Sequence, residues 1–529
     1  MPSNPANTAV STPMQQDMPE KVELATSKKH TYDQILKSSA LIGGSQAITI
    51  AIRIVRTKAM AVLLGPAGVG LIGVYESIAN LAQSIAGMGI NSSGVRQIAE
   101  AVGTGETDRI ARTVAVLRRT SVLLGILGAG LLVVLSRQVS ILTFGSDQHA
   151  TAVALLSLAV CFGLVSGGQG AMIQGMRRIS DLARMGVLGT LFGTIISIPV
   201  VYFMGERGVV PSLVGIAAMT ILTSWWYSRK VQIKPPAMSV SQVRYEAAGL
   251  LKLGVAFMVS GCLMMGAAYA VRTMVLRMVG FEAAGLYQSA WALGGLYVGF
   301  ILQAMGADFY PRLTAVAKDN TTCNRTVNEQ TQISLLLAGP GVLATLAFAP
   351  VVISLFYSGR FDGAVGILRW FCLGMTLRVI TWPMGFIILA KGESKFFFLT
   401  ELAWTLVNVG LSWICVRSFG LNGAGIAFFG SYIFHGLMIY PIVRHLSGFG
   451  WSAQNRQAGP FFLSLIAGVF CGFYLFPLWL ATAIGTLATL LSGVYSIRAL
   501  LNLVSIERIP RPILRLLGRF GLARSNPNS

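Results

Sequence analysis

Five basic residues stand inside otherwise apolar stretches of this sequence: Arg53, Arg56, Lys58, Arg272 and Arg378. Guanidinium and ammonium groups donate charge-assisted hydrogen bonds, so residues of this kind suit the binding of an anion. Arg53 and Arg56 are three residues apart, which places both side chains on one face of a helix. They could form an anion site if the surrounding elements hold them around a common space.

The composition defines what those elements are. Only 12% of the 529 residues are charged, whereas 54% are hydrophobic. Soluble proteins carry about 25% charged residues, so the bilayer must be the solvent of this chain. The net charge of +21 does not indicate nucleic-acid binding, because the basic residues lie between apolar stretches and not in aromatic-interleaved patches.

Apolar stretches of about 20 residues, the length that crosses a bilayer as a helix, alternate with short polar joints. The sequence predicts fourteen membrane-spanning helices, at residues 40–63, 69–90, 120–136, 150–173, 182–203, 208–227, 250–276, 285–306, 332–357, 364–389, 396–416, 422–443, 460–479 and 481–501.

Lysine and arginine are distributed unevenly between the two sides of these helices. If the N-terminus is cytoplasmic, most basic residues fall in cytoplasmic joints. The opposite side then receives only Arg137, Arg207, Arg277, Arg360, Arg369 and Arg417. Because an excess of Lys and Arg in short loops marks the cytoplasmic side, we predict a multi-pass protein of the bacterial inner membrane with both termini in the cytoplasm.

An internal repeat divides the chain. Gly65-x4-Gly70-Leu71 reappears as Gly280-x4-Gly285-Leu286, an offset of 215 residues. Three further matches follow at nearly the same offset: Met88-Gly89 with Met305-Gly306, Gly205-x2-Gly208 with Gly420-x2-Gly423, and 141–144 with 353–356. Since each half has an even number of helices, we expect a pseudo-twofold axis along the membrane normal and a binding site between the halves.

The predicted fold is therefore an all-α polytopic membrane protein with two six-helix lobes and an additional hairpin. Its divisions are a disordered cytoplasmic extension (1–36), an N-terminal lobe (37–228), a cytoplasmic linker (229–249), a C-terminal lobe (250–445), a transmembrane hairpin (446–504) and a basic cytoplasmic tail (505–529). The tail alternates arginines with apolar residues at helical spacing. That pattern suits binding to anionic inner-leaflet lipids, and a plain stop-transfer anchor is an equal alternative.

The five basic residues need a physical reason, because each costs at least about 2.5–3.5 kcal/mol at mid-bilayer. Arg53 lies near the centre of its helix, too far from the interface to reach it easily, so we expect its face to border a water-filled cavity. The alternative is pairing between helices with Glu76 or Glu401. The cavity is favoured because the basic residues outnumber these acids. Arg378, in the middle of the tenth helix, is a further candidate for a cavity.

Lys58 and Arg272 are related by the repeat, since they precede Gly65 and Gly280 by seven and eight residues. Two such cations facing one cavity would suit a pyrophosphate or an acidic sugar, whose charge is spread over several oxygens. Arg272 could instead extend to the outer interface.

Glu76 lies about 10 Å below the start of the second helix at 1.5 Å per residue. Lys58 reaches a similar depth from the other side of the same turn. The sequence therefore predicts a Lys58–Glu76 pair, with either a structural role or that of a proton-coupled latch.

The sequence lacks the residue patterns that several kinds of catalytic or metal site require. No Gly-Lys dipeptide occurs, so no Walker-type phosphate loop is expected. The four histidines and six cysteines have no metal-ligand spacing, and no long outer loop could hold a glycosyl-transfer site. We expect a protein that is not an enzyme and has no cofactor or metal.

The segment 58–70, with the pattern Lys-x2-Ala-Val-x2-Gly-Pro-Ala-Gly-Val-Gly, resembles the opening of Wzx-type polysaccharide flippases. Three later segments, 174–179, 208–213 and 310–313, also resemble that family. The similarity covers roughly residues 37–445. The family belongs to the multidrug/oligosaccharidyl-lipid/polysaccharide exporter superfamily.

This resemblance implies two six-helix lobes around a cationic cavity. It also implies transport of undecaprenyl-pyrophosphate-linked oligosaccharides from the cytoplasmic to the periplasmic leaflet, for O-antigen or a related surface polysaccharide. By the same resemblance, Arg53, Arg56, Lys58 and Arg272 are the candidates that hold the headgroup. Other membrane proteins of polysaccharide assembly are expected partners. The polar extension and the additional hairpin depart from the common pattern.

A drug or cation antiporter of the same superfamily is the main alternative. An antiporter for cationic drugs would need buried carboxylates, and this chain offers only Glu76 and Glu401 against five basic residues. A membrane glycosyltransferase or polymerase is a third class, and it lacks a loop for its site.

The predicted orientation can be measured with reporter fusions. Fusions after residues 145, 206 and 360 should report the periplasm, and those after 105, 238 and 320 the cytoplasm. An inverted result at any of these positions would contradict the orientation derived from the charges.

Overall fold

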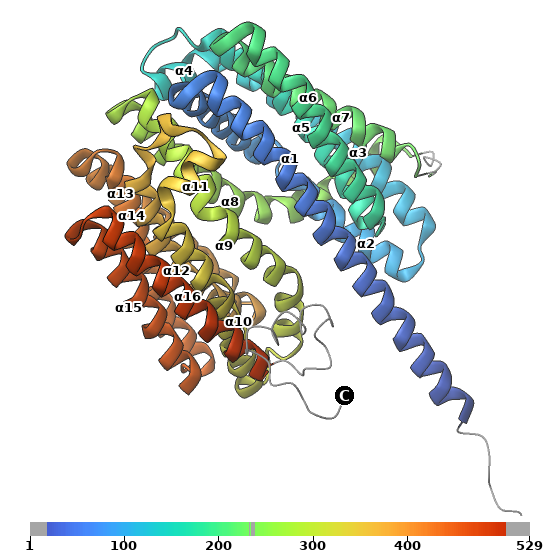
Figure 1. The fold of residues 1–529 in the computed structure, drawn as a ribbon. Coiled ribbons are helices and arrows are strands. Elements are labelled where there is room, and N and C mark those ends of the chain that lie inside the picture. The colour runs from blue at the N-terminus through green and yellow to red at the C-terminus, as the bar shows by residue number, and fades with distance from the viewer. Residues whose placement is uncertain (1–17, 232, 234–237, 504–529) are drawn as a thin grey trace, which may run out of the picture.

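The fold is described from a computed structural model, which covers residues 18–231, 233 and 238–503 (Figure 1). The described segments contain helices and no strands. Nine of the described helices are long and apolar enough to cross a membrane, or ten if the bent pair α10–α11 counts as one span. The prediction of an all-helical multi-pass membrane protein is thus confirmed.

The helices lie in two groups that Figure 1 shows side by side. The first group contains α1 Met18–Ala86, α2 Ile90–Thr104, α3 Thr107–Val134, α4 Ser136–Phe144, α5 Ala150–Gly175, α6 Ile179–Met204, the 3-10 turn η1 Gly205–Gly208 and α7 Val209–Ser228. The second contains α8 Val240–Val279, α9 Phe281–Ala315, α10 Asn320–Ala347, α11 Ala349–Phe356, η2 Gly359–Phe361, α12 Ala364–Ala390, α13 Ser394–Phe419, α14 Leu421–Ser447, α15 Ala453–Leu475 and α16 Leu478–Leu503.

The backbone of α1 breaks at Gly65, where φ is 65° and ψ is −170°. A residue with a Cβ avoids this region, and Pro66 directly after it cannot donate a helical hydrogen bond. The break separates a first half of α1, which carries Arg53 and Arg56, from a second half that carries Glu76. The predicted turn between the first two spans therefore lies where the sequence placed it.

Glycines matched by the repeat have matching conformations. Gly205 and Gly420 have φ/ψ of 58°/−136° and 57°/−138°. Gly280 also has a positive φ, 115°, as Gly65 does. These values support the predicted repeat, while the pseudo-twofold axis stays a prediction.

Two local predictions are wrong. The chain is helical from Met18, although residues 1–36 were predicted to be disordered, because residues 18–36 contain several helix formers such as Glu, Lys and Leu. Residues 1–17 lie outside the described part. The span 332–357 bends by 84° between α10 and α11, since Pro350 cannot continue a helix. The joint after residue 90, for which no conformation was predicted, is helical as α2.

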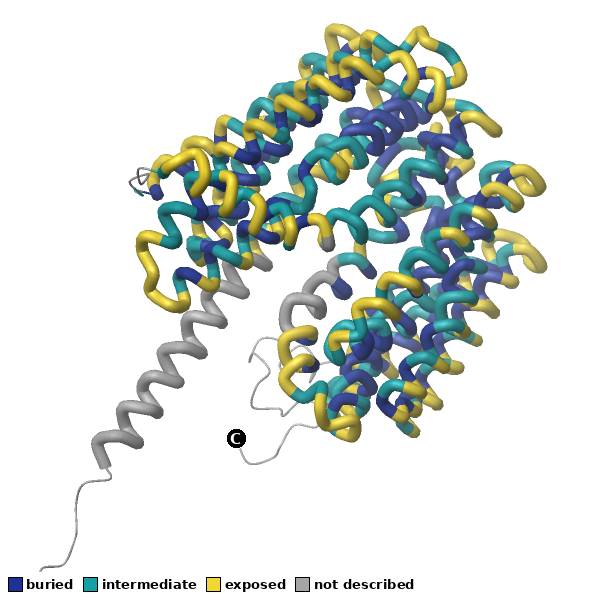
Figure 2. The backbone as a smooth tube through the Cα atoms, turned by 180° about the vertical axis from the view of Figure 1, so that it is seen from behind, coloured by how far each residue is buried: buried dark blue, intermediate teal, exposed yellow. Residues whose placement is uncertain are grey.

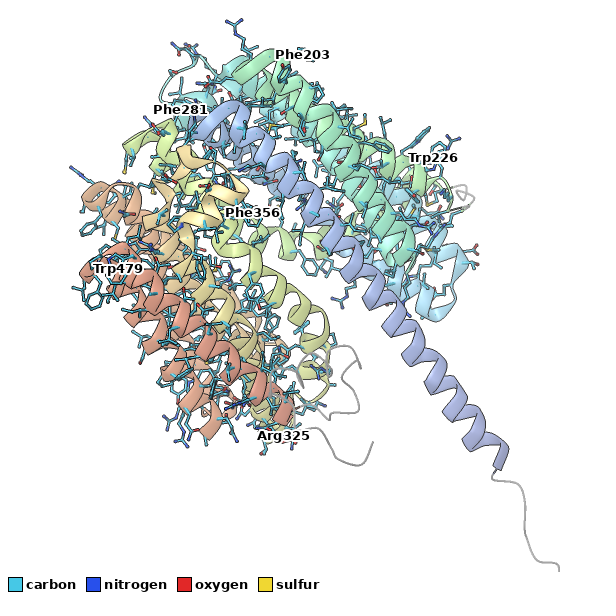
Figure 3. All side chains as sticks on the ribbon, in the orientation of Figure 1. Phe203, Trp226, Phe281, Arg325, Phe356 and Trp479 are labelled. Atoms are coloured by element: carbon cyan, nitrogen blue, oxygen red, sulfur yellow. The ribbon has the colours of Figure 1, made fainter. Side chains whose placement is uncertain are left out.

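Each group has its own hydrophobic core, and Figure 2 shows buried residues running through both. The core of the second group includes Phe371, Phe428 and Phe462, which come from α12, α14 and α15. The hairpin α15–α16 therefore shares the core of the second group. Large apolar side chains on the outside, such as Phe203, Trp226 and Trp479, protrude from the bundle, as expected of a surface that faces lipid (Figure 3).

The two groups touch most closely where α1 crosses the start of α9. A Cβ at Gly70 would lie 2.5 Å from the carbonyl oxygen of Phe281, and one at Gly285 would collide with the carbonyl oxygen of Pro66. Gly70 and Gly285 are 215 residues apart, and so are Pro66 and Phe281. This is the offset of the repeat, so each half makes the same contact with the other half. Only glycine permits this backbone-to-backbone approach. We call this contact the glycine crossing.

Adding a methyl group at the crossing should destabilise the protein. Gly285→Ala should lower the free energy of unfolding by about 1–3 kcal/mol, because neither backbone can yield without separating the helices. Gly299→Ala in the same helix is the matched control, since an added Cβ there meets nothing within 4 Å. Equal melting temperatures of the two purified variants would show that the crossing is not tight.

Candidate functional site

A cavity of about 670 Å³ lies within the first group of helices. We call it the N cavity. Its α1 lining includes Gln46, Thr49, Arg53 and Arg56, whose spacing of three or four residues places them on one helix face. The predicted common face of Arg53 and Arg56 is therefore present, and it borders a cavity.

The other walls of the N cavity come from α6 and α7. They contribute large apolar residues, such as Leu182 and Ile216, together with small or polar ones, such as Gly189 and Thr190. Glu76 and Asn80 complete the lining from the second half of α1. Small side chains leave volume in front of the arginines, and hydroxyl and amide groups keep the cavity compatible with water.

The arginines of the N cavity differ from other basic residues in their partners. Within the described residues, no hydrogen bond or ion pair engages Arg53 or Arg56, although Arg56 lies within electrostatic range of Glu76 and Arg53. By contrast, Arg109 at the start of α3 pairs with Glu100 of α2 at 3.4 Å. Two unengaged guanidinium groups facing one space can hold an anion with several oxygens.

A second space lies within the second group. It consists of two adjoining chambers of about 380 and 320 Å³ that share Met264, Trp382, Glu401 and His435. We call it the C cavity. Helices α8, α9, α12, α13 and α14 line it, together with Asn80 of α1. Asn80 therefore borders both cavities.

Arg272 and Arg378 lie at the C cavity. Arg272 donates to Gln288 Oε1 at 2.9 Å and to Ser77 Oγ at 2.8 Å, which joins α8 to α9 and α1. It thus does not extend outward to the interface. Arg378 faces the same space as Glu401, and its buried Nε has no hydrogen-bond partner among the described residues.

The predicted Lys58–Glu76 pair is wrong for this structure. Lys58 donates to the carbonyl oxygen of Ser354 in α11 at 2.7 Å, while Glu76 faces the N cavity with Arg56. The reason is the direction of the side chains around the helix. Lys58 follows Arg56 by two residues, which is a rotation of about 200°, so Lys58 points away from the face that carries Arg56. Lys58 lines neither cavity.

Lys58 instead helps to join the two groups at one end of the bundle. Arg277 of α8 donates to the carbonyl oxygen of Leu142 in α4 at 3.1 Å. Leu142 and Ser354 occupy the same place in the repeated segments 141–144 and 353–356. Each half therefore offers a basic residue to an equivalent carbonyl of the other half. With the glycine crossing, these contacts close the end that the charges predict to be periplasmic.

Sequence reasoning missed two parts of the site. Asn80 is an ordinary polar residue in the sequence, and only the packing of α1 against α8 shows that it lies between the cavities. The tryptophans Trp291, Trp382 and Trp404 of the C cavity come from three helices, so no spacing along the chain could have connected them.

Residues 59–366, more than half of the chain, match the model of a family described as "Polysaccharide biosynthesis protein". The "Lipid III flippase" of Escherichia coli (strain K12) is 23% identical over 412 residues, which are 75% of this chain and 95% of that protein. A "Putative O-antigen transporter" of Shigella flexneri is 25% identical over 401 residues, 74% of this chain and 94% of the relative.

Two solved structures share the fold. The lipid II flippase MurJ in an inward closed conformation has a TM-score of 0.67 at 14% identity, covering 87% of this chain and 99% of that one. An inward-facing multidrug resistance MATE family transporter of the MOP superfamily has a TM-score of 0.61 at 17% identity, covering 76% and 96%. At such identities the likeness concerns the fold alone.

The charge contacts can be tested with double-mutant cycles on the free energy of SDS-induced unfolding. Lys58→Met and Glu76→Gln should be additive within about 0.3–0.5 kcal/mol, because the residues share no contact. Arg56→Met and Glu76→Gln should deviate from additivity by more, because the two charges act on each other across the N cavity. Strong coupling of Lys58 with Glu76 would restore the pair that the sequence predicted.

Proposed function

The chain belongs to the polysaccharide biosynthesis protein family, and on this premise we propose that it is a lipid-linked oligosaccharide flippase. It moves undecaprenyl-pyrophosphate-linked oligosaccharides from the cytoplasmic to the periplasmic leaflet for O-antigen, exopolysaccharide or a related surface polysaccharide. The names of its relatives, a lipid III flippase and a putative O-antigen transporter, support this substrate class. It acts as a transporter and not as an enzyme.

One observation carries the proposal: Arg53 and Arg56 face a cavity of about 670 Å³ without a hydrogen-bonding partner among the described residues. Arg53 is exposed to this space, and Glu76 beside Arg56 is the one carboxylate that the described residues contribute to its lining, so an anionic ligand would neutralise the remaining positive charge. A pyrophosphate can present charged oxygens to both guanidinium groups at the same time. Arg272, held beside Asn80 by Ser77 and Gln288, adds positive charge on the side toward the C cavity.

The mechanism proposed is alternating access. With the glycine crossing closed, the substrate headgroup enters from the cytoplasmic side and neutralises the arginines. The two helix groups then rock about the crossing, which separates Lys58 from Ser354 and Arg277 from Leu142 and opens the periplasmic end. These contacts suit a reversible gate, because they join side chains to backbone carbonyls and bury no paired charges.

The location follows from the same proposal. The protein lies in the bacterial inner membrane with both termini in the cytoplasm, and its basic tail at 505–529, outside the described residues, binds anionic lipids of the inner leaflet. Other membrane proteins of polysaccharide assembly are its partners.

A proton- or sodium-coupled drug antiporter is the second candidate, since a MATE family transporter shares the fold. A cationic drug would meet Arg53 and Arg56 in one cavity and Arg272 and Arg378 in the other. Glu76 and Glu401 supply one carboxylate each to these linings. The excess of positive charge in both spaces favours the anionic substrate.

Substitutions in the N cavity test the flippase proposal. Arg53→Ala and Arg56→Ala should abolish complementation of polysaccharide display in a deletion strain and leave the precursor in the cytoplasmic leaflet. Arg→Lys at either position should impair transport in part, because lysine keeps the charge and loses the bidentate fork. Display of the polysaccharide and the amount of lipid-linked precursor are the measurements.

Arg417→Ala is the matched control, because Arg417 is exposed on α13 and lines neither cavity. It should complement fully. If the Arg53 and Arg56 variants disappear from the membrane while the control remains, the charges have a structural role. If they remain present and fully active, the anionic-cavity proposal fails and the antiporter gains support.

A further inference from the structure

The walls of the C cavity differ in kind from those of the N cavity. Trp291, Trp382 and Trp404 line the C cavity and are half-buried. Tyr432 also faces the C cavity, and its ring lies 5.8 Å from that of Trp404. Among the described residues, the lining of the N cavity contains no aromatic side chain. Both spaces contain arginines, but the aromatic faces belong to the C cavity.

Polar atoms without partners lie among these aromatic faces. Trp404 Nε1, His435 Nδ1 and Arg378 Nε are buried and have no hydrogen-bond partner in the described part of the chain. All three residues line the first chamber of the C cavity. A buried donor without a partner is destabilising, and native proteins rarely keep one without a reason. These atoms are covered in this conformation, and a ligand that brings its own acceptors and donors would satisfy them when the side chains turn toward the cavity.

A carbohydrate has the matching chemistry. A pyranose ring presents C–H faces that pack on an aromatic ring, and its hydroxyl groups both donate and accept hydrogen bonds around the edge. Tryptophan combines a large apolar face with an N–H donor. The chambers of about 380 and 320 Å³ fall within the range of about 300–1,000 Å³ that small-molecule sites occupy.

We propose that the C cavity binds the sugars next to the pyrophosphate. Their rings stack on Trp404 and Trp382, and their hydroxyl groups meet Arg378, Glu401 and His435. The inference rests on the proposed flippase function and assigns the two cavities to different parts of one substrate.

The position of Asn80 makes a shared substrate possible. Because Asn80 lines both cavities, a pyrophosphate held by Arg53 and Arg56 lies on one side of it and the attached sugars on the other. Arg272 contacts Ser77, one helical turn before Asn80. A cation therefore stands near the passage, where the second phosphate would meet the first sugar.

The same lining argues against an aromatic cation as the ligand. Arg272 and Arg378 face the C cavity with one carboxylate, Glu401. Tryptophan faces attract cations, but two guanidinium groups against one carboxylate repel them. A neutral or acidic sugar meets no such repulsion.

Binding of two probes to the full-length purified protein tests the assignment. One probe is undecaprenyl pyrophosphate, which carries no sugar, and the other is the undecaprenyl-pyrophosphate oligosaccharide extracted from a host that lacks this gene. The wild-type protein should bind the glycosylated probe more tightly in native mass spectrometry. Trp404→Ala should weaken that binding by roughly three- to tenfold, the loss of one aromatic contact, and leave the affinity for the bare probe unchanged.

Two further variants make the result independent of a single substitution. Trp382→Leu, on another helix, should show the same selective loss. Trp479→Ala is the matched control, because Trp479 is 72% exposed on the outside of α16 (Figure 3), and it should bind both probes as the wild type does. Arg53→Ala should weaken the binding of both probes to the same extent.

Unchanged affinity of the Trp404 and Trp382 variants for the glycosylated probe would overturn the sugar site. An equal loss of affinity for both probes in these variants would also overturn it, because the aromatic residues would then contact the pyrophosphate headgroup or stabilise the fold. If the wild-type protein binds neither probe, the proposed flippase function itself fails.

Discussion

The glycine crossing is the contact on which the arrangement of the two helix groups depends. Gly70 and Gly285 let α1 and α9 approach until backbone meets backbone, and each is placed by a glycine with positive φ that starts its turn, Gly65 or Gly280. Without this approach, Lys58 could not reach Ser354 and Arg277 could not reach Leu142. The closed end of the bundle thus combines glycines at fixed spacing with an apolar contact, in which Phe281 of α9 stacks on Phe144 of α4.

The same crossing decides where the cavities lie. Because the chain reverses at Gly65, the first half of α1 faces α6 and α7 and its second half runs along α8, as the contact of Arg272 with Ser77 shows. Glu76 and Asn80, one turn apart, therefore face the space in front of Arg53 and Arg56. The two halves of α1 thus place cations in one cavity and border the other.

Much of this arrangement could be predicted from local patterns. The Gly-Pro pair at 65–66 and the three-residue spacing of Arg53 and Arg56 have direct conformational consequences, and the repeat predicted which glycines would match. The Lys58–Glu76 pair failed because equal depth in the membrane does not imply the same direction around a helix. The C cavity could not be predicted, since Trp291, Trp382 and Trp404 are brought together only by the packing of α9, α12 and α13.

The most direct test of the account is a cryo-electron microscopy structure of the protein with the undecaprenyl-pyrophosphate oligosaccharide bound. The account predicts density for the pyrophosphate within hydrogen-bonding distance of the Arg53 and Arg56 guanidinium groups, with the attached sugars beyond Asn80. Pyrophosphate density elsewhere, with both arginines engaged by protein groups and the N cavity occupied only by water, would contradict it.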